Sequence, residues 1–417
     1  MRVAIVGGVR TPFVKAAGVF SKYSALDLGK HVVVGCVERL GLDPSVIEEL
    51  YFGTVLLDPR VPNLAREIVL RSGLPKSING HFIANNCITG LVAANAAVDA
   101  ISSGRISCAL VGGSESMSQP TLTFPRKGEQ FFLKLAKARG LGAKLSMVSS
   151  FRPGFLAPQA PSPKEPSTGL TMGQHCEIMA QEFKIARAGQ DQVAYNSHLY
   201  AAKARAAGVL GEQILPLGEV KEDNLIRPDT SLEALAALKP VFDRGAQGTI
   251  TAGNASALTD GASAVCLMSE DLARKQNREI LGFLDGVHVA SVPPGDGLLM
   301  APALALPEML KRFNLGFHDI DLFEVHEAFG AQVLCNLKAW RDGWDRYPNT
   351  AVRGDVPAER MNVAGGSIAI GHPFAATGGR LLLTICQALK QRGLKRGAIS
   401  VCAAGGGAAA ALVSAPG

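Results

Sequence analysis

Short apolar runs that end in glycine or polar residues alternate along this chain with runs whose apolar residues have helical spacing. The strand-like runs are "RVAIVGG", "SCALVGGSESMS", "DGASAVCLMSE", "DIDLFEVHEAF" and "AISVCAAGGGAAAALVS". Helical runs, such as residues 25–42 and 378–393, lie between them. A strand that is apolar throughout must be covered on both faces of its sheet, and the intervening helices are the elements that can cover it. The alternation therefore predicts an α/β fold.

Composition narrows the class of protein. The chain has 417 residues, of which 47% are hydrophobic and 19% charged, as in a globular protein of about two or three domains. No apolar run approaches the roughly 18 to 20 residues of a membrane span, and "MRVAIVGGVRTPF" lacks the apolar core of a signal peptide. The net charge of +6 is spread along the chain without an aromatic-basic motif, which favours an anionic ligand over nucleic acid.

The eight cysteines stand singly, without a CxxC pair or the spacing of a zinc site. We therefore expect free thiols, no metal ion and a reducing, cytoplasmic location. Neither "GGVRTPF" nor "AAGGGAAA" is a GxGxxG or Walker motif, which argues against a nicotinamide enzyme.

One cysteine, in "NNCITG", stands where a run of small residues becomes helical in character. The unpaired N–H groups and partial positive charge of a helix N-terminus favour a thiolate over a thiol. We therefore expect the pKa of Cys87 to lie below the usual value of about 8.5, which would make this residue a nucleophile. The alternative is a small buried hydrophobic side chain, the commoner role of a single cysteine.

Three late segments carry further chemical groups. "VHEAFGAQ" places His326 and Glu327 after an apolar strand, "GGSIAIGHPFAATGGR" places His372 among glycines, and "SVCAAGGG" places Cys402 at the end of a strand. Each residue taken alone is more often structural. Two thiols and two histidines together match a two-step acyl transfer, in which a thiol attacks, a histidine takes its proton and a second acid or base acts at carbon.

These motifs, with "GGSESMS" and "TAGNASALTDGA", resemble those of thiolases over essentially the full length of the chain. The histidine of "HEAF", where many members have asparagine, and "FRPGFLAPQAP" resemble the degradative branch, which includes the β subunits of fatty-acid-oxidation complexes. The resemblance implies two similar βαβαβαββ halves in a five-layer α-β-α-β-α sandwich. Residues 1–120 plus 251–275 would form the N-terminal half, 121–250 an inserted loop domain, and 276–417 the C-terminal half. A homodimer or a dimer of dimers is implied.

The resemblance also implies a role for each residue. Cys87 matches the acylated nucleophile, His372 its base, and Cys402 the acid or base at the α-carbon. His372 and a water held by His326 would form an oxyanion hole for an enolate, and the backbone N–H groups of Cys87 and Ala404 a second one. The family often has glycine in place of Ala404, but the backbone donor survives that change.

Coenzyme A is implied as a substrate, with no covalently bound cofactor. It would lie over the insertion near Arg227, Ala252 and Ser256, with Met172 near the thioester. Ala234 occupies a position where some members carry serine. The implied reaction is the CoA-dependent cleavage of 3-ketoacyl-CoA in fatty acid β-oxidation. The alternatives are a biosynthetic acetoacetyl-CoA thiolase, a ketoacyl synthase, which needs no second cysteine, and a non-catalytic CoA-binding scaffold subunit.

Residues 126–152 contain seven Lys or Arg but only one acidic residue, Glu129. The apolar residues that can share one face of a helix here are Phe131, Phe132, Leu135 and Ala136. Lys134 and Lys137 would lie away from that face. Such a segment suits a peripheral membrane contact, an acidic partner or the phosphates of CoA, and the alternative is a helix packed on the core with solvated lysines. The resemblance implies a hydratase/dehydrogenase α subunit as partner.

Overall fold

Two halves of a ten-stranded sheet meet where β1 pairs with β7 through Ala4–Phe283 and Ile5–Gly282. The structure, a computed structural model, describes residues 1–416. The strand order is β4-β3-β5-β6-β1-β7-β10-β9-β8, with β2 added on β6. The strands are β1 (Val3–Arg10), β2 (Val14–Lys15), β3 (Glu49–Gly53), β4 (Asn79–Ile83), β5 (Cys108–Glu115), β6 (Thr259–Ser269), β7 (Gly282–Ser291), β8 (Leu322–Val325), β9 (Arg396–Ala403) and β10 (Gly407–Ser414).

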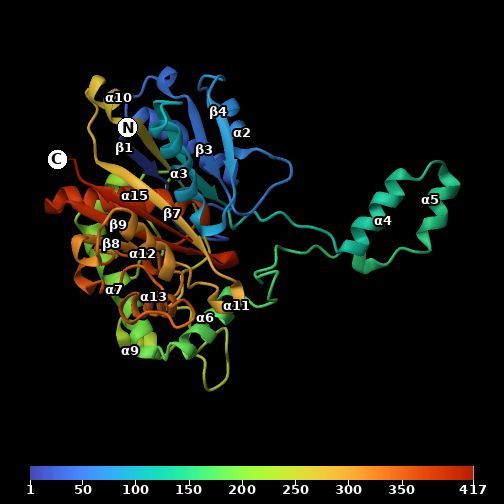
Figure 1. Ribbon diagram of the computed structural model, residues 1–417. Helices are drawn as coiled ribbons and strands as arrows, with labels where there is room; N and C mark the ends of the chain where they lie inside the picture. Colours follow the sequence, from blue (N-terminus) through green and yellow to red (C-terminus); the bar gives the residue numbers. More distant parts are fainter. Residues whose placement is uncertain (417) are drawn as a thin grey trace.

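The helices arrange these strands in five layers (Figure 1). One outer layer, α1 with α2, covers the first half of the sheet, and the other, α12 with α13 beside it, covers the second half. The central layer, α3 with α15, packs against strands of both halves. These helices are α1 (Ala25–Arg39), α2 (Leu64–Arg71), α3 (Thr89–Ser102), α12 (Pro302–Arg312), α13 (Gly330–Asp342) and α15 (Thr377–Arg392). The α/β class and the α-β-α-β-α sandwich are confirmed.

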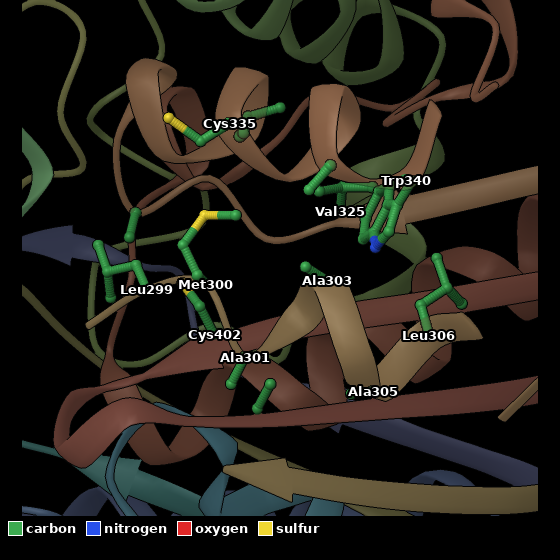
Figure 2. Packing of buried hydrophobic residues seen from close by; sticks show 14 of the residues in the cluster. Leu299, Met300, Ala301, Ala303, Ala305, Leu306, Val325, Cys335, Trp340 and Cys402 are labelled. Atoms are coloured by element: carbon green, nitrogen blue, oxygen red, sulfur yellow. The ribbon is translucent and has the colours of Figure 1, made fainter. Parts of the chain in front are cut away.

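Apolar residues fill each space between the layers. One cluster lies under α1 and α2, a second surrounds α3 and α15, and a third lies between the second half of the sheet and α12 and α13. Figure 2 shows the third cluster, in which Cys402 lies beside Met300 and Ala301. Trp340, the largest fully buried side chain, satisfies its indole N–H with the carbonyl of Pro302 at 2.9 Å. β1, β5, β6 and β9 are buried along almost their whole length because both faces of the sheet are covered there, whereas the edge strand β4 is partly exposed.

The two halves repeat one chain order with one difference. The first half reads β1-α1-β3-α2-β4-α3-β5-β6, and the second reads β7-α12-β8-α13, then α15-β9-β10. The third strand of the second half is reduced to a single parallel bridge between Phe323 and Met361. The last apolar run holds two strands, because Gly405 and Gly406 adopt φ of 76° and 74° and turn the chain back.

The chain between β5 and β6 is helical and irregular. Its helices are α4 (Arg126–Lys137), α5 (Leu141–Val148), α6 (Met172–Glu182), α7 (Arg187–Ala206), α8 (Val209–Gln213) and α9 (Leu232–Ala236). Helices α6 and α7 pack on α13, whereas α4 and α5 stand away from the body of the molecule (Figure 1). The proline-rich stretch is mostly irregular and contains a short 3-10 turn, Pro153–Leu156, and isolated bridges at Gln159 and Lys164. The division into three domains at the stated boundaries stays a prediction.

The remaining short helices are α10 (Glu270–Lys275), α11 (Pro294–Gly297) and α14 (Ser367–Ile370). Within residues 1–416, no helix is both long enough and apolar enough to cross a membrane.

Arg10 of β1 and Asp223 of the insertion form a fully buried, two-pronged ion pair, with N–O distances of 2.6 and 2.8 Å. This pair joins the insertion to the first half of the sheet.

Candidate active site

The N-termini of the two central helices meet at glycines. A Cβ on Gly90 of α3 would lie 2.8 Å from the carbonyl oxygen of Ala375, and a Cβ on Gly378 of α15 would lie 2.7 Å from the backbone nitrogen of Leu91. Real Cβ atoms do not approach backbone so closely, so glycine at both positions permits the contact. The contact brings the segment before α3, which carries Cys87, against the segment before α15, which carries His372.

Cys87 lies in the 3-10 turn Asn86–Ile88, directly before α3. Asn86 has a φ of 46°, and its side-chain amide donates to the carbonyl of Ala404 at 3.0 Å, which links this turn to the end of β9. The backbone N–H groups of Ala404 and of Cys87 itself act on the sulfur and lower its pKa. The sulfur therefore lies beside the two backbone donors assigned to one oxyanion hole.

The expected low pKa of Cys87 is wrong, because burial acts against it. Burial raises the pKa of this thiol to about 12, and the carboxylate of Glu115 acts in the same direction. The side chain is only 8% exposed, so the loss of hydration outweighs the backbone donors at the helix start. Cys87 is a protonated thiol at neutral pH and needs a base to become a nucleophile.

His372 is a buried imidazole with one nitrogen engaged. Its Nδ1 lies 2.7 Å from Oγ1 of Thr377, and its backbone N–H donates to Oγ1 of Thr259 at 3.0 Å. Its Nε2 is buried and has no hydrogen-bond partner in the part of the chain that the structure describes. Burial, with the charge of Arg380, lowers the pKa of His372 to about 3, so the ring is neutral and can accept a proton.

His326 lies against His372, with ring centroids 4.0 Å apart and planes at 47°. Its backbone N–H donates to the carbonyl of Ser400 at 2.8 Å, which fixes the segment to β9. Its Nδ1 lies 2.9 Å from Oγ of Ser367, and its Nε2, like that of His372, has no hydrogen-bond partner among the described residues. Burial lowers the pKa of His326 well below the usual range, and the neighbouring His372 and Arg380 add to this.

Cys402 of β9 completes the group. Its side chain is buried in the cluster of Figure 2, and the proximity of Cys87 adds to the burial that raises its pKa well above the usual range. The structure thus brings two protonated thiols and two neutral histidines to the junction of α3, α15 and β9. Acyl transfer and proton transfer at carbon are the chemistry that such a group can perform.

The residues predicted to bind CoA are more scattered. The segment 251–258 runs between the two histidine motifs, since Ala255 bridges to Phe329 and Leu258 to His372. Ser256 lies in this segment, and its backbone N–H donates to the carbonyl of Ala328 in "HEAF" at 2.9 Å.

Of the other three predicted contacts, Ala252 lies in the same segment as Ser256, whereas Met172 and Arg227 lie earlier in the chain, within the insertion. Ala252 is exposed, and so is Arg227, whose backbone N–H donates to Nδ1 of His198 at 3.2 Å. Met172 is the first residue of α6 and packs against the third cluster. Of the four, Ser256 is the one whose hydrogen bond joins it to a histidine motif.

Residues 3–271 match the family model described as "Thiolase, N-terminal domain", and residues 278–415 match "Thiolase, C-terminal domain". The chain belongs to the thiolase family. This confirms the resemblance, and it makes the chain a member of a family of acyltransferases.

This thiolase is 41% identical to a 3-ketoacyl-CoA thiolase of Pseudoalteromonas translucida (strain TAC 125), over 99% of this chain and 97% of that protein. It is 39% identical to a 3-ketoacyl-CoA thiolase of Shewanella denitrificans, over 99% and 96%. Its structure is similar to an acetyl-CoA acetyltransferase of Syntrophomonas wolfei, with a TM-score of 0.85 and 28% identity over 100% of this chain and 99% of that one. A Bacillus anthracis acetyl-CoA acetyltransferase gives a TM-score of 0.83 at 28% identity, over 100% and 99%.

Sequence reasoning missed the residues that hold the thiolase histidines. Ser367 and Thr377 stand five residues before and after His372, inside a quoted motif, but the spacing alone does not show which histidine each contacts. Arg380 reaches Ser367 from α15, a contact with no sequence signal.

Glu327 also has a structural role that the sequence did not reveal. Its buried carboxylate accepts from Ser197, from Asn362 and from the backbone of Ile368, at 2.7, 2.7 and 3.2 Å. It lies so close to Gly366 that a Cβ there would overlap the carboxylate. Glu327 therefore fixes the backbone around the histidine motifs.

Within residues 1–416 of this thiolase, no three His, Cys, Asp or Glu side chains are disposed to hold a metal ion. All eight cysteines are free and buried, including Cys108 and Cys266, whose sulfurs lie 3.9 Å apart.

Proposed function

We propose that this chain is a 3-ketoacyl-CoA thiolase that cleaves 3-ketoacyl-CoA with coenzyme A, giving acetyl-CoA and a shortened acyl-CoA in fatty acid β-oxidation. The observation that carries the proposal is the convergence of Cys87, His326, His372 and Cys402. Two buried thiols, each protonated at rest, match a reaction that needs one nucleophile and one acid at carbon. The relatives named 3-ketoacyl-CoA thiolase support the degradative direction over the biosynthetic alternative.

In this mechanism His372 takes the thiol proton at Nε2 while Sγ of Cys87 attacks the 3-keto carbon. The oxygen of the tetrahedral intermediate lies between the backbone N–H groups of Cys87 and Ala404. The bond between carbons 2 and 3 then breaks, leaving an acyl group on Cys87 and the enolate of acetyl-CoA. His372 and a water held by His326 stabilise the enolate oxygen, and Cys402 protonates carbon 2. Coenzyme A then attacks the thioester, giving its thiol proton to the thiolate of Cys402, and the departing sulfur of Cys87 takes back its proton from His372.

The purified chain should be tested for CoA-dependent loss of 3-ketoacyl-CoA over a series of chain lengths. We expect cleavage of substrates longer than acetoacetyl-CoA, whereas cleavage of acetoacetyl-CoA alone would support the biosynthetic thiolase. Mass spectrometry after incubation with acetyl-CoA should show an acetyl group on the peptide that contains Cys87. The Cys87→Ser variant should bind CoA but lose this adduct. Absence of the adduct from the wild type would support the non-catalytic scaffold.

Coenzyme A is proposed to lie over the insertion, near Arg227, Ala252 and Ser256, with Met172 near the thioester. Ser256 is well placed for this role, since its backbone is bonded to the "HEAF" segment. The exposed guanidinium of Arg227 can meet the negative charge of CoA. The insertion, residues 121–250, would thus be the CoA- and acyl-binding domain, without a metal ion or a bound cofactor.

The proposed assembly is a homodimer or a dimer of dimers that acts in the cytoplasm. Eight free cysteines, with two sulfurs 3.9 Å apart and unbonded, support a reducing compartment. A hydratase/dehydrogenase α subunit is the proposed partner, since its product would be the 3-ketoacyl-CoA that reaches Cys87.

The arm formed by α4 and α5 is the proposed contact for the partner or for a membrane surface. Its internal packing is aromatic: Phe131 contacts Phe151 and Phe155, with ring centroids 5.6 and 5.5 Å apart. Part of the predicted apolar face is therefore used within the arm. A second apolar set remains exposed, at 59 to 74%: Leu133, Leu141, Leu145 and Val148. Exposed leucines beside lysines suit the surface of an anionic membrane.

A further inference from the structure

The two active-site histidines are held by different hydroxyl groups. Nδ1 of His326 lies 2.9 Å from Oγ of Ser367, and Nδ1 of His372 lies 2.7 Å from Oγ1 of Thr377. In a neutral imidazole one nitrogen carries the proton and the other accepts, and the partner of Nδ1 decides which. Each hydroxyl can donate or accept, so its other hydrogen bond sets the direction.

Ser367 has a second partner that can only donate. Nη2 of Arg380 donates to its Oγ at 3.0 Å, and a guanidinium has no acceptor. Ser367 is fully buried, and His326 and Arg380 are the partners of its hydroxyl in the described part of the chain. If the ring nitrogen also donated to Oγ, the hydroxyl hydrogen would be buried without an acceptor, which is unfavourable. The hydroxyl of Ser367 therefore donates to Nδ1 of His326.

Thr377 has a second partner that can only accept. Its Oγ1 lies 3.4 Å from the carbonyl oxygen of Pro373, four residues earlier, the usual acceptor for a threonine at the start of a helix. Because its hydrogen is directed to that carbonyl, Oγ1 accepts from Nδ1 of His372. The hydroxyl of Ser367 thus donates a hydrogen bond to its histidine, whereas the hydroxyl of Thr377 accepts one from its histidine.

We propose that Ser367, fixed by Arg380, and Thr377 are positioning residues that hold the two neutral histidines in opposite tautomers. His326 carries its proton on Nε2 and is a hydrogen-bond donor toward the enolate oxygen or its water. His372 carries its proton on Nδ1 and keeps a free electron pair on Nε2, as the base for Cys87 requires. Both Nε2 atoms are buried and have no hydrogen-bond partner among residues 1–416.

This division of labour rests on the proposed function and predicts that the two hydroxyls affect different steps. Ser367→Ala should slow the exchange of the α-protons of acetyl-CoA at least ~tenfold but leave the acylation of Cys87 within about twofold, since loss of an oxyanion donor affects the enolate step. Thr377→Val should slow acylation at least ~tenfold, since it weakens the base. Ser367→Thr and Thr377→Ser, which keep the hydroxyl, should restore each step. A purely structural role would slow both steps together and would overturn the proposal.

Neutron diffraction from deuterium-exchanged wild-type crystals tests the tautomers without reference to activity. We expect deuterium on Nε2 of His326 and on Nδ1 of His372. Deuterium on Nδ1 of His326, or on Nε2 of His372, would overturn the proposal. The expected tautomers in a protein without thiolase activity would overturn the proposed function and leave the assignment of the hydroxyl groups intact.

Discussion

Two opposing effects act on the thiol of Cys87. Backbone N–H groups at the start of α3 and at Ala404 lower its pKa, and burial raises it, to about 12. The sequence indicated the helix start, because small residues follow the cysteine at once. It could not indicate the burial, because the chain that covers Cys87 comes from β9 and from the segment before α15, more than 280 residues away. The role of Cys87 as nucleophile stays a prediction, and the expected direction of its pKa shift is reversed by burial.

The pH dependence of alkylation tests that protonation state. Below its pKa a thiol is ten times more ionised for each unit of pH, so Cys87 should react with iodoacetamide faster at each step from pH 6 to 10, without a plateau. His372, whose pKa is about 3, stays neutral over this range and adds no step. The rate can be followed by mass spectrometry of the Cys87 peptide, with Cys87→Ser as the control for other thiols. A plateau between pH 6 and 8 would show a resting thiolate and contradict the burial argument.

Cys402 should be separable from Cys87. Cys402→Ala should still accept an acetyl group on Cys87, because attack and proton transfer at carbon are different steps. It should fail to exchange the α-protons of acetyl-CoA, by about 10² to 10⁴-fold for the loss of a general acid or base. Deuterium uptake into acetyl-CoA, measured by mass spectrometry, gives the rate. Exchange at the wild-type rate would remove Cys402 from the mechanism.

At the scale of elements, the spacing of the apolar residues and the composition of each run predicted most of the strands and the helices that cover them. The runs at residues 25–42 and 378–393 became α1 and α15, and the quoted apolar runs became β1, β5, β6, β8 and the β9–β10 pair. The contact between α3 and α15 could not be predicted. Glycine at positions 90 and 378 indicates that another part of the chain approaches closely, but the sequence does not show which backbone segment it is. The hydroxyl partners of the histidines depend on that same contact.

Gly90→Ala tests the contact between the central helices. The new Cβ would lie 2.8 Å from the carbonyl oxygen of Ala375, so one helix must shift, at a cost of roughly 1 to 3 kcal/mol in unfolding free energy. Acylation of Cys87 should also slow, because the shift moves the thiol relative to His372. Urea unfolding and the acetyl-CoA adduct measure the two effects.

Gly211→Ala in α8 is the matched control, since no atom of the described residues lies within 4 Å of a Cβ built at this position. It should be neutral or stabilising by up to about 1 kcal/mol, because alanine is the better helix former. Equal stability and equal acylation in Gly90→Ala and Gly211→Ala would contradict the account of the central contact.

At the scale of the whole molecule, the resemblance predicted five layers, and the three apolar clusters fill the spaces between them. The single bridge at Met361 in place of a strand had no sequence signal, since a short apolar stretch can form a strand or a loop according to its neighbours. The basic segment 126–152 was predicted as one amphipathic region. The structure divides it into α4 and α5 and sets it apart from the body, so its exposed residues face solvent rather than the core (Figure 1).

The arm is the last feature to test, by reversing its charge with Lys134→Glu, Lys137→Glu and Lys144→Glu together. Each lysine near an anionic membrane contributes about 1 kcal/mol, so binding to vesicles that contain phosphatidylserine should fall by well over ~tenfold. The matched control reverses Lys30, Lys203 and Lys311, which are exposed on the body, and should bind as the wild type does. Sedimentation with vesicles and co-purification from the native cell are the measurements. If the chain purifies only as a homo-oligomer, and the arm variant changes neither vesicle binding nor partners, the arm is not a docking surface.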